Sequence, residues 1–141
     1  MIDYNNLLKK NTINVLKDIL KHIENHGLTT NNQIFISFFT NYPSVRIPDW
    51  LKEKYPEEMT IVIQHEFYDL NVEENFFEIT LSFSDIKTSI KIGYDSVISF
   101  ADPSRNFGLK LINDNLDEEK KIDKIKNDKD NIINFANFKK N

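Results

Sequence analysis

The first part of the chain places apolar side chains at the spacing of an α-helix. Between residues 4 and 26 they recur mostly three and four positions apart, at Leu8, Val15, Leu16, Ile19, Leu20 and Ile23. Charged residues fill many of the positions between them, so a helix here would have one apolar face and one charged face. Gly27 follows directly, and glycine readily takes the left-handed conformation that ends many helices. The pattern therefore predicts an amphipathic helix over residues 4–26.

From residue 33 onward the pattern changes to short runs rich in β-branched and aromatic residues. Such runs cover residues 34–39, 60–64, 67–72, 76–83, 88–92 and 97–101, and residues 107–111 add a last edge strand. Prolines at positions 43 and 48 indicate an extended loop before the second strand, since proline interrupts a sheet ladder. The regular spacing predicts a mainly β fold, a compact antiparallel barrel or sandwich over residues 33–111, in a domain covering residues 1–111.

The C-terminal part of the chain divides into two segments of opposite composition. Residues 112–131 hold twelve charges and only four large apolar side chains, so we expect a disordered, charged linker. Residues 132–141 are again rich in apolar side chains and carry two lysines near their end; the side chains concerned are Ile132, Ile133, Phe135, Phe138, Lys139 and Lys140. An apolar patch at the end of a solvated tether favours docking to another protein. The alternative is a tail strand that folds back onto the barrel.

Composition narrows the class of protein. The chain has 141 residues, of which 40% are hydrophobic, and this suits one domain with a real core. The net charge of -4 argues against broad binding to a nucleic-acid backbone, and the lack of cysteine excludes disulfides and thiolate metal sites. No apolar stretch approaches the roughly 18 residues of a membrane span, and the N-terminus lacks the layout of a secretory signal. We expect a soluble cytoplasmic protein that binds neither membrane nor nucleic acid.

The residue types that often serve in catalysis or metal binding give no support for either role in this sequence. His22 and His26 would share a helix face, but no third ligand is evident nearby, so packing at the helix end is favoured over metal binding. His65 and Glu66 are neighbours on a predicted strand, where they would point to opposite faces and form no acid–base pair. The three glycines are too dispersed for a phosphate-binding loop. We therefore expect no enzyme, no metal and no cofactor.

The remaining features suit the binding of an extended peptide beside a strand edge. There a ligand backbone pairs with the protein backbone while its side chains fill apolar pockets. Residues 45–51 are apolar, stiffened by proline and bear the sole tryptophan, so they form either a groove wall or a lid over the core. Gln64, polar at the end of an apolar strand, either offers a donor and an acceptor to a peptide or faces water. A single-stranded RNA site would need basic residues between exposed aromatics, and the β region is acidic instead.

Several runs resemble one known family. The run KYPEEMTIVIQHEFYDL at residues 54–70 is similar to the α-proteobacterial form of stringent starvation protein B (SspB), a family of adaptors for the ClpXP protease. The similarity continues through FFEITLSF at 76–83, FADPS at 100–104 and FGL at 107–109, and it returns in the tail at 132–140. It covers most of residues 33–111, and the run from residue 54 is long enough to be specific.

The resemblance implies an SH3-like or Sm-like barrel, a homodimer joined through the N-terminal helix, and a groove for the ssrA degradation tag. The positions that match the groove are Val45, Arg46, Ile47, Gln64, Phe100, Ala101 and Asp102. It also implies a tether whose end docks on the N-terminal zinc-binding domain of the ClpX unfoldase through Ile132, Ile133, Phe135, Phe138, Lys139 and Lys140. Phe135 stands where Leu is usual, and Ala136 where an acidic residue is usual. The expected function is a tethering adaptor, with an Sm-like single-stranded RNA-binding module as the alternative.

Overall fold

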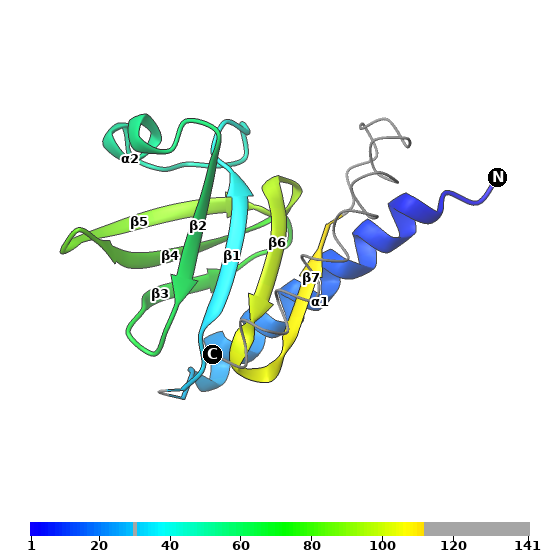
Figure 1. Cartoon of the computed structure of the whole chain (residues 1–141), viewed down its shortest axis with the longest axis horizontal. Coiled ribbons are helices and arrows are strands. Elements are labelled where there is room, and N and C mark those ends of the chain that lie inside the picture. Colours follow the sequence, from blue (N-terminus) through cyan, green and yellow to red (C-terminus); the bar gives the residue numbers. More distant parts are fainter. Residues whose placement is uncertain (30, 112–141) are drawn as a thin grey trace.

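The structure is a computed structural model that describes residues 1–29 and 31–111. Its elements in chain order are α1 (Tyr4–His26), β1 (Ile34–Phe39), α2 (Asp49–Lys54), β2 (Glu58–Ile63), β3 (Tyr68–Val72), β4 (Phe76–Phe83), β5 (Ile86–Gly93), a 3-10 turn (Tyr94–Ser96), β6 (Val97–Asp102), a second 3-10 turn (Pro103–Arg105) and β7 (Phe107–Lys110). Figure 1 shows a mainly β fold with an N-terminal helix, which confirms the predicted class. The predicted linker and docking segment, residues 112–141, lie outside the described residues.

Helix α1 has the bounds that the sequence pattern predicts. Asp3 caps its start, because the Oδ1 atom of Asp3 accepts a hydrogen bond from the backbone N–H of Asn6 over 3.1 Å. Gly27 follows its end with a φ of 73° and donates its N–H to the carbonyl of Ile23 over 2.7 Å. Its ψ of -170° lies outside the left-handed helical region that the sequence pattern predicts, but the positive φ likewise favours glycine at the helix end.

The apolar face of α1 is buried in one half of the helix and exposed in the other. Leu16, Leu20 and Ile23 join the hydrophobic core. Toward its N-terminus the helix runs past the sheets (Figure 1), and four large side chains there are exposed: Tyr4, Leu7, Leu8 and Val15. Within the described part of the chain, nothing buries this second half of the face.

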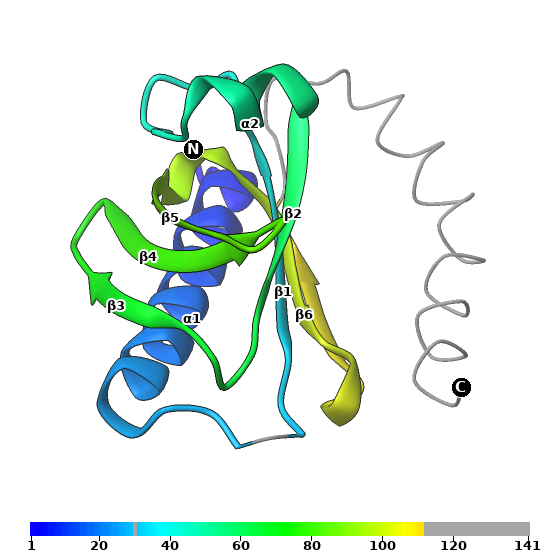
Figure 2. The same ribbon diagram turned by 90° about the vertical axis from the view of Figure 1, so that its left-hand side faces the viewer.

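The strands form two antiparallel sheets around a common core. One sheet has the order β2-β1-β6-β7, and the other has the order β3-β4-β5. Figure 2 shows the two sheets meeting at an angle, with α1 beside them. An isolated antiparallel bridge between Arg46 and Lys91 joins the segment before α2 to the edge of β5. The close approach continues at Gly93, where an added Cβ atom would collide with the side chain of Ser44, so only glycine fits.

The alternation of side chains between the two faces of each strand determines which residues form the core. In β1, Ile34, Ile36 and Phe38 are buried, while the residues between them are half-buried. Phe77 and Ile79 of β4 point into the same core from the other sheet. The predicted strands are all present, and their observed ends lie within two residues of the predicted ones.

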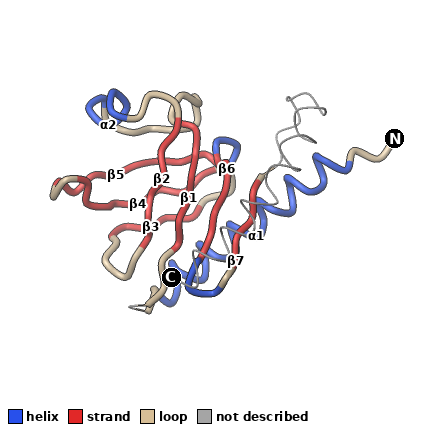
Figure 3. The backbone as a smooth tube through the Cα atoms, viewed as in Figure 1, coloured by secondary structure: helices blue, strands red, loops and turns tan. Residues whose placement is uncertain are grey.

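The sequence pattern misses helix α2, besides the two short 3-10 turns. Pro48 occupies its N-cap in extended backbone, and the helix begins directly afterwards at Asp49. Figure 3 shows α2 as a short helix between loops. Proline is compatible with a helix start because the first backbone N–H groups of a helix have no partner inside it. Leu51 then becomes buried in the core. The predicted extended loop is therefore correct before Pro48 and wrong from Asp49 onward.

Candidate functional site: a pocket between two strand edges

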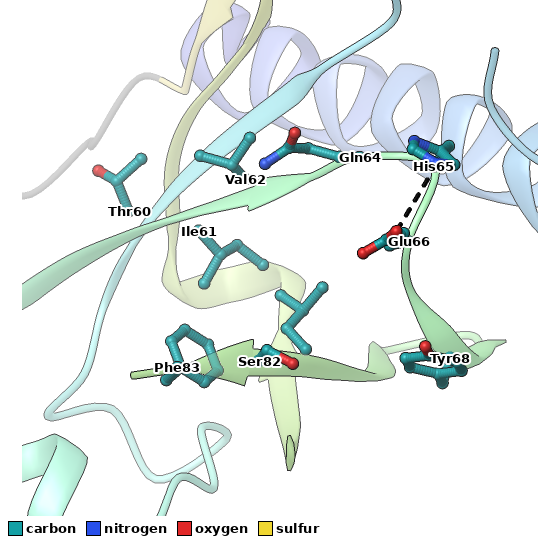
Figure 4. A pocket seen from close by; sticks show the side chains of 10 residues that line it. Thr60, Ile61, Val62, Gln64, His65, Glu66, Tyr68, Ser82 and Phe83 are labelled. Atoms are coloured by element: carbon teal, nitrogen blue, oxygen red, sulfur yellow. Dashed lines mark ion pairs between the residues drawn. The ribbon is translucent and has the colours of Figure 1, made fainter. Parts of the chain in front are cut away.

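An open pocket lies between β2 and the end of β4, where the two sheets come together (Figure 4). Its volume is about 520 Å³. The lining residues come from β2, the β2–β3 connection, the start of β3 and the end of β4: Thr60, Ile61, Val62, Gln64, His65, Glu66, Tyr68, Leu81, Ser82 and Phe83.

Both strands present an edge to this pocket. β2 is the end strand of its sheet, paired only with β1 among the described residues. β3 pairs with β4 only as far as Tyr68 opposite Thr80, so no described strand pairs with residues 81–83 of β4 on that side. The β3–β4 register shifts between Tyr68 and Asn71, and Asp69 there has a φ of 54°. Free strand edges offer backbone N–H and C=O groups to a ligand.

The pocket has an apolar floor and a polar rim. The side chains of Ile61 and Leu81 are 1% and 6% exposed and belong to the hydrophobic core. Thr60, Gln64 and Ser82 are exposed around them. An extended polypeptide suits this combination, because its backbone can pair with a strand edge while one side chain fills the apolar space.

Gln64 is the predicted tag-binding residue that lines the pocket. It directly follows Ile63, the last residue of β2. Its Oε1 atom accepts a hydrogen bond from Nε2 of Gln33 over 3.3 Å. No described residue accepts a hydrogen bond from the Gln64 amide nitrogen, so this donor is available to a ligand.

His65 and Glu66 are arranged differently from the prediction. They lie in the connection between β2 and β3 rather than on a strand, so their side chains do not have to alternate. Nε2 of His65 and Oε1 of Glu66 are 4.0 Å apart at the rim of the pocket (Figure 4). The side chains are 49% and 79% exposed, so water screens the contact, which contributes little to stability.

The predicted groove residues Val45, Arg46 and Ile47 lie before α2 and are not part of the pocket lining. Arg46 exchanges two backbone hydrogen bonds with Lys91 of β5, over 2.8 and 2.9 Å. Val45 and Ile47 are half-buried and pack against the hydrophobic core. In the described structure their contacts are therefore with β5 and the core.

The predicted residues Phe100, Ala101 and Asp102 end strand β6, and they also lie outside the pocket lining. Phe100 is buried in the core, with its ring centroid 6.2 Å from that of Phe107. The carboxylate of Asp102 is buried and accepts hydrogen bonds from the backbone N–H of Ser104, from the hydroxyl of Ser104 and from the side-chain amide of Asn32.

The register places Gln64 and Asp102, two of the three polar members of the predicted groove, at one end of the four-stranded sheet. Phe35 of β1 lies opposite Val62 of β2 and opposite Ala101 of β6. Gln64 and Asp102 therefore lie near the same end of the sheet, but β1 separates their strands. The structure brings these two residues to one end and leaves residues 45–47 beside β5.

Most of the pocket lining was not identified from the sequence. In the sequence, nothing distinguishes Tyr68, Ser82 and Phe83 from ordinary strand residues. They lie near β2 because of the way in which the two sheets meet. A usable signal was the polar run Gln64-His65-Glu66 between two apolar runs, because a polar connection at a strand end often lines a site.

The described residues give little support to other kinds of site. No group of three or more His, Cys, Asp or Glu side chains among them could hold a metal ion. The exposed rings of His22 and His26 lie with their centroids 4.7 Å apart on α1. None of the helices in the described part of the chain has both the length and the apolar character that crossing a bilayer requires.

Fold and pocket together define a small, mainly β domain with an open site between the edges of two antiparallel sheets. The sequence model of one family, stringent starvation protein B (SspB), matches residues 7–139, nearly the whole chain. The chain therefore belongs to the SspB family. No curated protein matches it. Membership of this family implies an adaptor-type role with the ClpXP protease.

Proposed function

We propose that this protein is an adaptor that binds ssrA-tagged polypeptides in the pocket between β2 and β4 and tethers them to the ClpX unfoldase. The observation that carries the proposal is the pair of free strand edges on either side of an apolar floor. A tag segment entering as an extended strand pairs its backbone with β2, places a side chain against Ile61 and Leu81, and meets the amide of Gln64. Binding in this mode forms hydrogen bonds and apolar contacts, and no covalent bond is made or broken.

In this proposal residues 45–47 and 100–102 lie outside the pocket and act beside it. Asp102 binds the side chain of Asn32, and the neighbouring Gln33 contacts Gln64. A tag longer than the pocket extends past Gln64 toward this end of the sheet. Val45, Arg46 and Ile47 contribute by fixing the segment that leads into α2 beside β5.

Delivery requires a second contact, which we assign to the tail. In this proposal residues 1–111 form the tag-binding domain, residues 112–131 act as a flexible charged tether, and residues 132–141 dock on the N-terminal domain of ClpX. A flexible chain of twenty residues has an end-to-end distance of about 25 Å, which allows cargo and unfoldase to be engaged together. Two weak contacts joined in this way raise the local concentration of the tagged chain at ClpX.

Dimerisation is the third part of the proposal. The exposed apolar half of α1, formed by Tyr4, Leu7, Leu8 and Val15, is the support for it. A two-fold dimer is the commonest way in which a protein covers such a surface, and it presents two pockets and two tails on one adaptor.

The rival function, a single-stranded RNA-binding module, has weaker support. The pocket lining contains neither Lys nor Arg and includes the carboxylate of Glu66. Titrations of a labelled ssrA-tag peptide and of a labelled single-stranded RNA, followed by fluorescence anisotropy at two salt concentrations, separate the two functions. We expect the peptide to bind with micromolar or lower Kd and weak salt dependence, because phosphate contacts weaken steeply with salt and an apolar pocket does not. Tight, salt-sensitive RNA binding without peptide binding would contradict the proposal.

A further inference from the structure

One cation stands over an aromatic ring that lines the pocket. The ammonium group of Lys87 lies 4.1 Å from the ring centroid of Tyr68. Tyr68 is a lining residue and is 44% exposed, so the contact holds the ammonium group beside the pocket lining. The ring attracts the cation through its negative face, which holds the long lysine side chain in one place.

Strand register explains how Lys87, which is not itself a lining residue, reaches the lining residue Tyr68. On β4, Ser82 lies opposite Lys87 of β5, and Thr80 lies opposite Tyr68 of β3. Positions two apart on a strand point to the same face, so these side chains share the outer face of the three-stranded sheet. Lys87 therefore crosses β4 diagonally, and its charge comes to lie beside the lining residues Ser82 and Tyr68.

This charge has no compensating carboxylate in the described structure. Among residues 1–29 and 31–111, no Asp or Glu oxygen lies within 4.0 Å of the Lys87 ammonium group. The lining itself contains one carboxylate, that of Glu66, which lies 4.0 Å from His65. An exposed cation held over the ring of a lining residue is well placed to select the charge of a ligand.

We propose that Lys87 is a specificity-determining residue of the pocket and selects peptides that carry a carboxylate at the position beside Tyr68. The inference rests on the proposed binding of an extended peptide between β2 and β4. A peptide Asp or Glu side chain at that position forms a charge-assisted hydrogen bond with the ammonium group, while the ring of Tyr68 keeps the ammonium group in place. Glu66 disfavours acidic residues near the β2–β3 connection, so the preference is confined to one position of the peptide.

Lys91 provides a matched control. It is also on β5, and its ammonium group lies 4.2 Å from the ring centroid of Phe76. Neither lysine is itself a lining residue, but the ring partner of Lys87 lines the pocket and the ring partner of Lys91 does not. Lys91→Met therefore removes the same kind of cation–aromatic contact from the same strand without changing the charge at the pocket mouth.

The test uses labelled ssrA-tag peptides in which each position in turn carries Glu or Gln, and fluorescence anisotropy gives the Kd of every pair. For the unmodified protein we expect one position at which Glu binds about two- to fivefold more tightly than Gln, as expected for a partly exposed ion pair. Lys87→Met should remove this preference, Lys87→Glu should reverse it in favour of Gln, and Lys91→Met should retain it. A reversal cannot result from misfolding, so it reports on charge alone.

The inference is wrong if no position prefers Glu, or if the preference survives in both Lys87 variants. If in that case Gln64→Ala still weakens every peptide, the pocket assignment stands and only the role of Lys87 is lost. If the unmodified protein binds none of the peptides, the proposed function and this inference both fail.

Discussion

The side chain of Gln33 donates a hydrogen bond to the side chain of Gln64 over 3.3 Å, linking the segment before β1 to the segment after β2. The bond occupies the amide oxygen of Gln64 and leaves its amide nitrogen as a donor at the end of the pocket. A backbone carbonyl of a bound tag is the natural acceptor for this donor.

Gln64→Ala is accordingly expected to weaken tag binding while the fold stays intact. A peptide polar group that loses its partner on binding costs about 1 to 3 kcal/mol, which corresponds to roughly one to two decades in Kd. Anisotropy titration of a labelled tag peptide measures the change, and circular dichroism checks the fold.

Asn71→Ala is the matched control for this change. Asn71 is an exposed amide on β3 that hydrogen-bonds to Glu73 and Glu78 and does not line the pocket. Its removal should leave tag affinity unchanged. If Gln64→Ala binds the tag as well as the unmodified protein does, Gln64 has no part in the site.

The exposed half of α1 predicts a homodimer. Leu8 is 53% exposed and Leu7 is 49% exposed, and a partner helix would cover both. Sedimentation of the full chain at micromolar concentration should give a dimer mass, and Leu8→Lys should shift it toward monomer, because a charge inside an apolar interface is costly to bury. Lys10→Ala, on the charged part of the same helix, should leave the dimer intact. A monomer mass for the unmodified protein would refute this part of the proposal.

The tail is expected to act in delivery and not in tag binding. Deleting residues 132–141 should leave the melting temperature and tag affinity unchanged, but it should abolish accelerated degradation of tagged substrate by ClpXP, since avidity is lost with one of two linked contacts. Phe138→Ala should reproduce most of this defect, because an aromatic anchor dominates many short docking motifs. Loss of Lys139 and Lys140 should matter less and depend on salt.

Two results would count against this role of the tail. Delivery at the full-length rate by the truncated protein would show that the adaptor does not need the segment. A melting temperature several degrees lower after truncation would show that the segment is a folded strand of the domain, the alternative that the sequence left open.

The buried phenol of Tyr94 leads us to expect that the protein becomes less stable at alkaline pH. This phenol is buried and donates a hydrogen bond to the carbonyl of Glu73 over 2.9 Å. Burial raises the pKa of Tyr94 above its usual 10.0, and the carboxylates of Glu24 and Glu73 raise this pKa further, while the ammonium group of Lys17 lies 5.7 Å from the ring centroid. The folded state therefore holds this proton more tightly than the unfolded state does. The resulting stabilisation is complete below the unfolded pKa and is lost as the pH rises above about 10.

Tyr94→Phe makes this effect measurable. At neutral pH the variant should lose about 0.5 to 1.5 kcal/mol of unfolding free energy with the hydrogen bond to Glu73. The difference in unfolding free energy between the two proteins should narrow as the pH rises from 9 to 11. Only the unmodified protein has this phenol, whose raised pKa in the folded state makes it lose stability over that range. Urea unfolding at both pH values provides the comparison, and a constant difference would contradict the assigned pKa shift.

The sequence pattern predicted the fold more completely than the site, and the reasons are physical. Helix α1 and the strands follow from periodic burial, a local signal that each segment carries by itself. Helix α2 was missed because Pro48 reads as a break, although a proline at a helix start is compatible with the helix that follows.

The pocket depends on how two sheets meet, which no single segment encodes. Gln64 was identified because a polar residue ends an apolar strand, whereas Ser82 and Phe83 were missed because only the short reach of β3 leaves their strand edge open. His65 and Glu66 were assigned to a strand, and the structure places them in a connection where their side chains meet.

The most direct test of the binding site is a titration of ¹⁵N-labelled protein with unlabelled ssrA-tag peptide, followed through the backbone amide resonances. If the tag enters as a strand between the two edges, the largest shifts fall on residues 60–68, from β2 to the start of β3, and on residues 81–83 of β4. Saturable shifts confined to other parts of the domain, such as residues 45–47 and 100–102, or no shifts at millimolar peptide, would contradict binding in this pocket.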